Sequence, residues 1–492
     1  MNYPELLRLA FPEAHVAVTA LIVLTIGLAR PRAAAAASAV AALGLVFAAI
    51  SVLRLPENAS FGGSMLVISP LSSLFKLVCL VLAFFTILLA QNDSASRRHH
   101  AEYLAIILLA TIGLLLLVGS DELLMIFIGL ELTGLALYVL TAFDRASSRG
   151  AEAGLKYFLF GSTASAFTLF GLSLIYGLTG TTALAGIAQA LSRNATAAPL
   201  LLSAGIVMAL IGFAFKIAAA PFHLWAGDAY EAAPIPSAAF IASGSKVAAF
   251  LVLGKVLLLA LAPLQGRAGW DAFAAGWSPL LAVLAALSII IGNLVALAQR
   301  NVRRLLAYSA VAHAGYTLLG LIAGGVDGFS ATLFYTTTYA FTLLGAFGVV
   351  ASVRRATGGD DLPRFAGLAA RSPLLAGCLA VFLLSLAGLP PLAGFFGKFY
   401  LFSAAFRAGG DHGLLWLVAV ALFGSLISLY YYLSILRVVF TGESPVRDLP
   451  PAHFAEGLPV AALAAVVLLL GIFPGALLSR VVTAVQSSLA GF

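Results

Sequence analysis

The segment FAFKIAAAPFHLW, residues 213–225, places a lysine, a proline and a histidine inside a long apolar run. Pro221 has no backbone N–H and clashes with the preceding turn, so it interrupts a helix and frees carbonyl groups one turn earlier. Lipid cannot satisfy those carbonyls, and the break therefore favours a hydrated pocket beside Lys216. His223 follows the break and titrates near neutral pH when unperturbed. It either relays protons or satisfies a freed carbonyl group.

The rest of the chain is also strongly apolar. Of its 492 residues, 62% are hydrophobic and 10% are charged, and the mean hydropathy is +1.06. Soluble proteins carry about 25% charged residues, so we expect an all-α integral membrane protein. The two cysteines, Cys79 and Cys378, are too few for an iron–sulfur cluster, which takes about four thiolates. The sequence contains no glycine motif for a nucleotide, and we expect no cofactor and no metal in this chain.

About fourteen apolar segments approach the length of roughly 20 residues that a spanning helix needs. They lie near residues 12–29, 33–54, 66–91, 102–119, 122–142, 153–178, 199–225, 236–262, 278–298, 303–323, 328–352, 372–406, 413–440 and 458–479. The seventh is interrupted at Pro221, and the twelfth is interrupted by GLPPLAGF, residues 388–395.

These two breaks lie five segments apart, which suggests two five-helix units in helices 4–8 and 9–13. Because five is odd, the second unit would be inverted in the membrane, an arrangement found in many transporters. The expected regions are 1–100 with helices 1–3, 101–262 and 263–440 with the two units, and 441–492 with helix 14.

The arginines in the connections predict the orientation. One side of the membrane holds fourteen of them: Arg30, Arg32, Arg97, Arg98, Arg145, Arg149, Arg300, Arg303, Arg304, Arg354, Arg355, Arg364, Arg371 and Arg447. The other side holds six: Arg8, Arg54, Arg193, Arg267, Arg407 and Arg480. The richer side is expected to be cytoplasmic, with both termini outside. This distribution explains the net charge of +7 without a nucleic-acid partner.

All six lysines lie within apolar segments or at their ends. Arginine is almost always protonated, but a buried lysine can release its proton because burial disfavours the charged form. Lys246 lies in the middle of the eighth segment, where a charge is costly and therefore indicates a function. Lys76 and Lys156 lie toward segment ends, where they could instead extend to the membrane surface. Lys255 lies closer to the end of the eighth segment than Lys246 does. For Lys255, a functional role and a structural role both stay open.

Acidic residues are placed as selectively as the lysines. Glu131 lies at the centre of the fifth segment, where the alternative is a neutral carboxyl group held by a hydrogen bond. Glu152 begins the sixth segment, and an acid at a helix N-terminus is favourable without any further role. Asp121 and Glu122 are expected to cap the fifth segment.

Two further ionisable residues lie in the second unit. Lys398 follows the Pro390–Pro391 break. His313 lies in the middle of the tenth segment near Tyr308 and Tyr316, where it could also be a satisfied core residue. Together, the buried ionisable residues predict a chain of protonatable sites along the membrane midplane, made of Glu131, Lys216, Lys246, His313 and Lys398.

Five stretches carry a resemblance to a known family. They are LKYFLFGSTASAF (155–167), FAFKIAAAPFHLWAGDAYEAAPIPSAAF (213–240), SKVAAF (245–250), RNVRRLLAYSAVAHAGY (300–316) and LAGLPPLAGFFGKFYLF (386–402). In them the chain resembles the antiporter-like membrane subunits of NADH-quinone oxidoreductase, respiratory complex I. Two features narrow the resemblance within that family. No lateral helix follows the fourteenth span, and Lys398 stands where another member is expected to carry glutamate.

The resemblance implies a proton-translocating subunit coupled to NADH oxidation and quinone reduction in other subunits. NAD, FMN, iron–sulfur clusters and quinone are then expected in those subunits, and the partners are other membrane-arm subunits, lipid, protons and water. It also implies a bacterial inner-membrane location.

The resemblance also implies roles for individual residues. Glu131 resembles the carboxylate that pairs with Lys216, Lys246 the central proton carrier, and Lys398 the group nearest the outer exit. Glu152 matches a further acidic position. One departure is Gly227 in WAGD, where the family often has proline.

Other functions remain open from the residues alone. A subunit of a multi-subunit cation/proton antiporter, or of a membrane-bound hydrogenase, would share the fold. A stand-alone secondary transporter would need a defined substrate pocket. A structural scaffold would leave the five mid-span charges unexplained.

Overall fold

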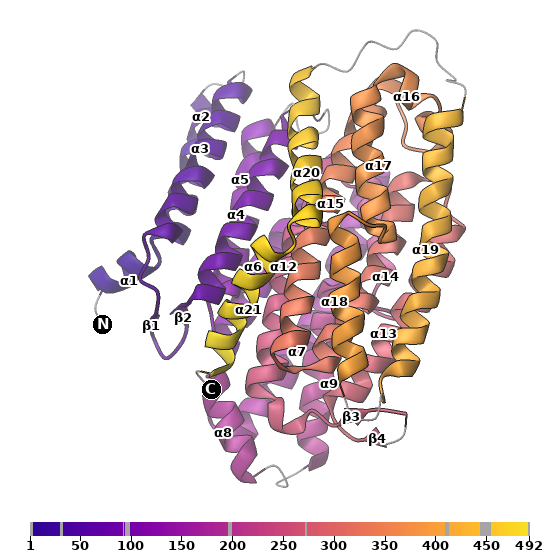
Figure 1. The fold of residues 1–492 in the computed structure, drawn as a ribbon. Helices are drawn as coiled ribbons and strands as arrows, with labels where there is room; N and C mark the ends of the chain where they lie inside the picture. Colours follow the sequence, from indigo (N-terminus) through magenta and orange to yellow (C-terminus); the bar gives the residue numbers. More distant parts are fainter. Residues whose placement is uncertain are drawn as a thin grey trace.

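The computed structural model describes residues 3–29, 33–91, 93, 99–194, 199–270, 273–408, 413–442 and 454–490. Five of the arginines used to predict the orientation, Arg30, Arg32, Arg97, Arg98 and Arg447, lie outside these residues. The described helices run up and down in one bundle, with short hairpins and irregular turns at its two ends (Figure 1).

The elements follow one another along the chain in this order. In the first half they are α1 Tyr3–Leu9, α2 Phe11–Ala29, α3 Ala34–Leu53, β1 Ala59–Phe61, β2 Leu66–Ile68, α4 Pro70–Ala90, α5 His100–Val118, α6 Leu123–Thr141, α7 Ser148–Thr179, α8 Leu184–Asn194, α9 Pro199–Lys216, α10 Leu224–Ala232, α11 Ile235–Ala242 and α12 Gly244–Lys255. In the second half they are η2 Val256–Ala260, η3 Ala262–Leu264, β3 Arg267–Ala268, β4 Phe273–Ala274, α13 Trp277–Leu297, α14 Val302–Ala323, α15 Gly325–Thr357, η4 Leu362–Phe365, α16 Leu368–Arg371, α17 Pro373–Ala387, α18 Ala393–Arg407, α19 Leu415–Thr441, α20 Phe454–Ile472 and α21 Gly475–Ala490.

The prediction of an all-helical membrane protein is confirmed, but two of the predicted spans are each divided into two helices that differ from the predicted segment. Within the described residues, 12 helical spans are long and apolar enough to cross a membrane, and a bent pair could make 13. That pair is α20 and α21, which meet at 75° where the sequence predicts one straight segment at 458–479. The predicted twelfth segment is divided into the short helices α17 and α18.

Both predicted breaks are present. The seventh segment ends as a helix at Lys216 and resumes at Leu224, and the twelfth is interrupted between Ala387 and Ala393. Each interruption contains a cis peptide bond, Ala220–Pro221 in the first and Pro390–Pro391 in the second.

The eighth segment is also irregular, which the sequence did not predict. Its helix is interrupted at Ser243, with φ −112° and ψ −83°, so α11 and α12 are separate helices. The π-helix η2 follows directly after Lys255. π-Helical turns are rare and often occur at functional sites. The predicted eighth span is thus present over Ile235–Ala260, with an interruption at Ser243 that no proline marks in the sequence.

The centre of the bundle is formed by α11 and α12, α14 and α15. Almost every residue of these helices is buried, although they carry hydroxyl, imidazole and ammonium groups. By contrast, α2, α3, α7 and α13 expose many large apolar side chains, as lipid-facing helices do. The polar groups thus lie inside the protein and not against lipid.

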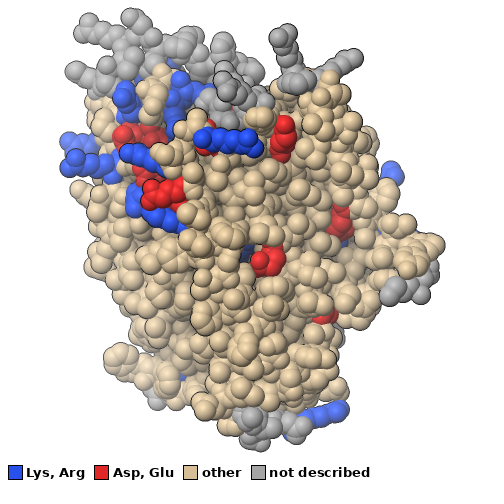
Figure 2. All heavy atoms as spheres, turned by 180° about the vertical axis from the view of Figure 1, so that it is seen from behind, with Lys and Arg blue, Asp and Glu red and all other residues tan. Residues whose placement is uncertain are grey.

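The two ends of the bundle differ in charge. The connection that holds η4 and α16 lies at the upper end in Figure 1, whereas α8 and the β3–β4 hairpin lie at the lower end, and α21 runs down toward that end. Figure 2 shows that charged side chains gather at the upper end, whereas a few, mostly acidic, lie scattered over the middle of that face. Nine of the described arginines used in the prediction belong to upper connections: Arg145, Arg149, Arg300, Arg303, Arg304, Arg354, Arg355, Arg364 and Arg371.

Candidate functional site

Lys216 is the last residue of α9 and is 6% exposed. Its ammonium lies beside α6. A side-chain carbon on Gly134 would be 3.6 Å from that ammonium and 3.2 Å from the Tyr138 hydroxyl. A side chain at position 134 would therefore be crowded by Tyr138 and in ordinary contact with the lysine.

Glu131 lies one helical turn before Gly134 on α6 and is half-buried. Its carboxylate accepts a hydrogen bond from the Ser165 hydroxyl of α7. Although both residues are described, Glu131 and Lys216 form no ion pair. In this conformation Ser165 holds the carboxylate on the α7 side, and the pairing with Lys216 stays a prediction. The two charges nevertheless lie within electrostatic range of each other.

The backbone around the first break is satisfied locally. Trp225 Nε1 donates to the carbonyl oxygen of Phe215 (3.2 Å), and the Ala220 N–H donates to the Ser288 hydroxyl (2.8 Å). His223 is 6% exposed, and its Nδ1 has no hydrogen-bond partner among the described residues. The histidine ring meets the Tyr308 ring edge-on, with centroids 6.2 Å apart. Both readings of His223, as a proton relay and as a partner of a freed carbonyl group, therefore stay predictions.

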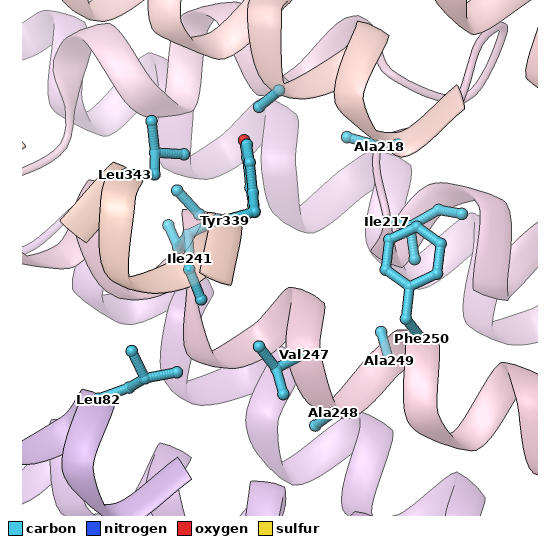
Figure 3. Packing of buried hydrophobic residues seen from close by; sticks show 14 of the residues in the cluster. Leu82, Ile217, Ala218, Ile241, Val247, Ala248, Ala249, Phe250, Tyr339 and Leu343 are labelled. Carbon is cyan, nitrogen blue, oxygen red and sulfur yellow. The ribbon is translucent and has the colours of Figure 1, made fainter. Parts of the chain in front are cut away.

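Lys246 lies in the first turn of α12, directly after the interruption at Ser243. It is 3% exposed, and its ammonium donates a hydrogen bond to the Ala310 carbonyl oxygen of α14 (2.6 Å). The same ammonium lies over the Tyr339 ring of α15, 5.8 Å from its centroid. Figure 3 shows the apolar packing near this turn, where Val247, Ala248 and Phe250 follow the lysine on α12 and Ile217 and Ala218 come from the first break.

His313 lies on α14, three residues after Ala310. Its Nδ1 is 2.6 Å from the Tyr335 hydroxyl, and its Nε2 is 3.1 Å from the Tyr432 hydroxyl. The ring also stacks on Tyr335, and its centroid is 4.9 Å from that of Tyr339. Both Lys246 and Lys398 lie within electrostatic range of this histidine. His313 is thus hydrogen-bonded at both ring nitrogens and lies within the electrostatic range of both lysines.

Lys398 lies in the second turn of α18 and is 5% exposed. Its ammonium donates to the Ala387 carbonyl oxygen at the end of α17 (3.0 Å) and to the Ser425 hydroxyl of α19 (2.8 Å). It also lies over the Tyr316 ring, 5.2 Å from the centroid. A cation at a helix C-terminus is favoured by the exposed carbonyl groups. The break at Pro390 and Pro391 therefore provides the acceptor that Lys398 uses.

Two other lysines pair with carboxylates outside this chain of sites. Lys76 on α4 is fully buried and lies 2.6 Å from a Glu13 carboxylate oxygen on α2. Of the two readings left open for Lys76, the structure therefore excludes extension to the membrane surface. Lys255, 1% exposed, lies 2.8 Å from the Asp121 carboxylate and donates to the Val118 carbonyl oxygen (3.0 Å). Both pairs flank the turn between α5 and α6, because Lys76 packs against Gly119.

Of the two residues expected to cap α6, Asp121 and Glu122, only Glu122 does so. The Glu122 side chain accepts a hydrogen bond from the Met125 N–H (2.7 Å), as a helix cap does. Asp121 does not cap this helix but pairs with Lys255.

Glu152 and Lys156 lie at the upper end of the bundle. They form an ion pair of 2.7 Å on α7, and the Glu152 side chain is 65% exposed. Lys156 also lies 2.9 Å from Asp228 on α10, which in turn pairs with Arg304 on α14 (2.8 Å). These residues line a cleft of about 510 Å³. Glu152 and Lys156 are therefore separate from the buried lysines at mid-bundle.

Sequence reasoning missed most of the groups that join the predicted sites. These are Ser165 at Glu131, Tyr339 at Lys246, Tyr335 and Tyr432 at His313, Ser425 at Lys398, and the Asn293–Tyr316 and Asn293–Tyr431 hydrogen bonds beside them. The one signal in the sequence is the run of tyrosine and threonine residues in 335–342, which is unusual for an apolar span. It does not show which partner each hydroxyl takes.

Comparison with known proteins gives the family. The family model for "NADH:quinone oxidoreductase/Mrp antiporter, TM" matches residues 120–428. NADH-quinone oxidoreductase subunit N 2 of Acidobacterium capsulatum is 45% identical over 97% of this chain and 99% of its own length. A chain of respiratory complex I from Thermus thermophilus with bound aureothin is 33% identical, with a TM-score of 0.77 over 95% of this chain and 98% of that chain. A chain of the Mrp complex from Dietzia sp. reaches a TM-score of 0.83 over 98% of this chain and 97% of that chain, at 23% identity.

These likenesses separate the functions that the residues left open. The Mrp likeness shows a shared fold, because it lies at 23% identity. By contrast, this chain is 45% identical to an NADH-quinone oxidoreductase subunit over nearly its whole length. The family predicted from the sequence motifs is thus confirmed. The chain belongs to the subunit N family of NADH-quinone oxidoreductase, the antiporter-like, proton-pumping membrane-arm subunits of respiratory complex I.

Proposed function

We propose that protons cross this subunit through Glu131, Lys216, Lys246, His313 and Lys398, in that order. The observation that carries the proposal is the arrangement around His313. Tyrosine hydroxyls contact both ring nitrogens. Lys246 lies over the Tyr339 ring and Lys398 over the Tyr316 ring, and the centroids of these rings are 4.9 Å and 5.5 Å from that of His313. A neutral imidazole can accept a proton on one nitrogen and release one from the other. His313 is therefore suited to pass a proton from Lys246 toward Lys398.

Glu131 would control the first step by exchanging partners. When its carboxylate pairs with Lys216, the charge of that lysine is balanced. When the carboxylate returns to Ser165, as in this structure, Lys216 loses that balance and its charge acts on Lys246. Like charges in a weakly polarisable interior repel strongly, so the Lys246 proton would move to His313 and then to Lys398. Glu152 and His223 would serve as accessory groups on the cytoplasmic side.

The distribution of arginines supports the orientation. With the arginine-rich upper end in the cytoplasm, both chain termini would face the outer side of the bacterial inner membrane. Lys398 would then be the last buried group before the outer exit. The regions 101–262 and 263–440 would form the two inverted five-helix units, each with one broken helix.

The redox chemistry would take place elsewhere in the complex. NAD, FMN, iron–sulfur clusters and quinone would be bound by other subunits, and neighbouring membrane-arm subunits would transmit the energy to Glu131. The lipid bilayer would cover the exposed apolar helices.

The test is the number of protons translocated per NADH oxidised by the assembled enzyme in liposomes. Lys246→Ala and Glu131→Ala should each lower that ratio, because each removes one switchable group from the path. A matched control is the double variant Glu13→Leu, Lys76→Met, which removes a buried lysine outside the path. An unchanged ratio in both single variants would overturn the proposal.

A further inference from the structure

Asn293 is a fully buried side chain of α13 that the proposed path does not use. Its amide nitrogen donates to the Tyr316 hydroxyl of α14 (2.9 Å) and to the Ile289 carbonyl oxygen one turn earlier (2.8 Å). Its amide oxygen accepts a hydrogen bond from the Tyr431 hydroxyl of α19 (3.0 Å). Because the Ile289 carbonyl group can only accept, the amide nitrogen must face that group, which fixes the orientation of the whole amide.

The Tyr316 ring contacts two residues of the proposed path. Its centroid is 5.5 Å from that of His313, with the rings edge to face, and the Lys398 ammonium lies over it at 5.2 Å from the centroid. A cation within about 6 Å of an aromatic ring centroid is attracted to the face of the ring. The position of the Tyr316 ring therefore affects both the imidazole that releases the proton and the lysine that receives it.

Tyr431 connects Asn293 with His313 by a second route. The Tyr431 ring packs against that of Tyr432, with centroids 4.6 Å apart, and the Tyr432 hydroxyl is 3.1 Å from Nε2 of His313. Helices α13, α14 and α19 lie side by side in the bundle (Figure 1), so that one amide on α13 holds a tyrosine from each of the other two helices. Within the described part of the chain, Asn293 forms no hydrogen bond with His313 or Lys398, and it acts on them through its tyrosine partners.

Gly424 on α19 leaves the space around this amide free. A side-chain carbon at position 424 would crowd Ile289 and would lie 2.8 Å from the amide nitrogen of Asn293 and 2.9 Å from the Tyr316 hydroxyl. Side-chain carbons in proteins essentially never approach other atoms so closely. A larger residue at position 424 would therefore press on the hydrogen bond between Asn293 and Tyr316 without removing either partner.

We propose that Asn293 is a positioning residue for proton transfer from His313 to Lys398. Its amide donates and accepts hydrogen bonds but has no titratable proton, so it holds the two tyrosines without itself carrying a proton. The inference rests on the proposed function, because it concerns one step of that path. A misplacement of about 1 Å can slow a reaction about 100-fold, so loss of this amide should slow the transfer but not abolish it.

The test is the number of protons translocated per NADH oxidised by the assembled enzyme in liposomes, at saturating and at limiting NADH. In Asn293→Leu we expect a lowered ratio at saturating NADH, because the slowed transfer is not completed in every turnover. When limiting NADH slows the turnover, the transfer has time to finish and the ratio should recover. In Lys398→Ala the ratio should stay low at both NADH concentrations, because the receiving group is absent.

Gly424→Ala is a second variant, which keeps every polar group. It should show the same dependence on NADH concentration as Asn293→Leu, and it decides the question if Asn293→Leu does not assemble. The matched control is Gly377→Ala on α17, where an added carbon has open space among the described residues. The control should have a normal ratio at both concentrations, and a lowered ratio in it would count against the inference, because any added methyl group would then have this effect.

The outcomes separate the positioning role from the path on which it rests. A normal ratio at saturating NADH in Asn293→Leu, with a low ratio in Lys398→Ala, would overturn the role of Asn293 and leave the path intact. A ratio that stays low at limiting NADH in Asn293→Leu would also overturn it, because a proton leak or a general loss of structure does not recover when turnover slows. A normal ratio in Lys398→Ala would overturn the path and this inference together.

Discussion

The Lys246 ammonium donates a 2.6 Å hydrogen bond to the backbone carbonyl of Ala310, three residues before His313 on the same helix. A backbone carbonyl accepts a hydrogen bond but carries no net charge, and Lys246 forms no ion pair with any described carboxylate. The carbonyl group therefore orients the lysine side chain, but it does not hold the lysine in its protonated form as a carboxylate would. Lys76 and Lys255 differ in this respect, because each is paired with a carboxylate. This contrast separates the lysine suited to exchange protons from those that hold helices together.

Replacing His313 should interrupt proton transfer and also destabilise the bundle. In His313→Leu the Tyr335 hydroxyl loses its 2.6 Å partner. A buried unpaired hydroxyl costs about 1–3 kcal/mol, so the assembled enzyme should dissociate at a lower temperature. The ratio of protons to NADH should fall as in Lys246→Ala.

A double variant separates these two effects. His313→Leu combined with Tyr335→Phe removes both partners, so the thermal stability should recover while the proton ratio stays low. Recovery of both quantities together would show that His313 has a structural role only.

Ser165 should set the rate of the proposed exchange at Glu131. Ser165→Ala removes the hydroxyl that holds the carboxylate on the α7 side, which leaves Lys216 as its nearest candidate partner. A hydrogen bond to a charged group contributes about 1.5–3 kcal/mol, equivalent to tenfold or more in rate. We therefore expect slower coupled NADH oxidation with an unchanged proton ratio.

The conservative variant Ser165→Thr keeps the hydroxyl and serves as the control. It should retain most of the activity, as measured by NADH oxidation in sealed and uncoupled vesicles. Equal rates in Ser165→Ala and the unmodified enzyme would argue against a switching role for this hydrogen bond.

The sequence predicted those features that depend on local chemistry. A proline in an apolar segment interrupts a helix wherever the segment packs, so the breaks near Pro221 and Pro390 were predictable. The cost of a charge at mid-membrane likewise makes Lys246 and Lys398 candidate functional residues on the basis of sequence alone.

Features that depend on the choice between distant partners were not predictable. Glu131 had two possible partners, and the resemblance pointed to Lys216, whereas the carboxylate contacts Ser165. Tyr432 reaches His313 across 119 residues of sequence. The interruption at Ser243 has no proline beside it in the sequence, and it lies between two helices that both pack against α15.

The pair of Glu13 and Lys76 should be structural. Removing one partner of a buried pair leaves an uncompensated charge and costs about 3–5 kcal/mol. Glu13→Leu alone should therefore lower the dissociation temperature of the complex strongly. The double variant Glu13→Leu, Lys76→Met should recover it, because well-packed apolar residues can replace a buried pair at little cost.

The proton ratio provides the second measurement for this pair. Since Lys76 lies between α2 and α5, away from Lys246, the double variant should pump normally. A stable double variant with a lowered ratio would place Glu13 and Lys76 in a proton path.

Arg303 and Arg304 are neighbours in sequence but should differ in their effect on stability. The Arg303 side chain is 3% exposed, pairs with Asp360 and donates to the Ala233 carbonyl oxygen (2.8 Å), whereas Arg304 is 32% exposed. Losing a buried partner costs about 3 kcal/mol or more, and an exposed pair contributes about 0.2–1 kcal/mol. Arg303→Ala should therefore lower the dissociation temperature of the assembled enzyme much more than Arg304→Ala.

The chemistry of the guanidinium group sharpens this comparison. Arg303 contacts a carboxylate and a backbone carbonyl at once through different nitrogen atoms, which a single ammonium cannot reproduce. Arg303→Lys should therefore remain less stable than the unmodified enzyme, whereas Arg304→Lys should match it, as followed by thermal dissociation in mild detergent. Equal losses at the two positions would mean that the cleft is hydrated down to Arg303, and that the connection between α14 and α10 does not depend on a buried ion pair.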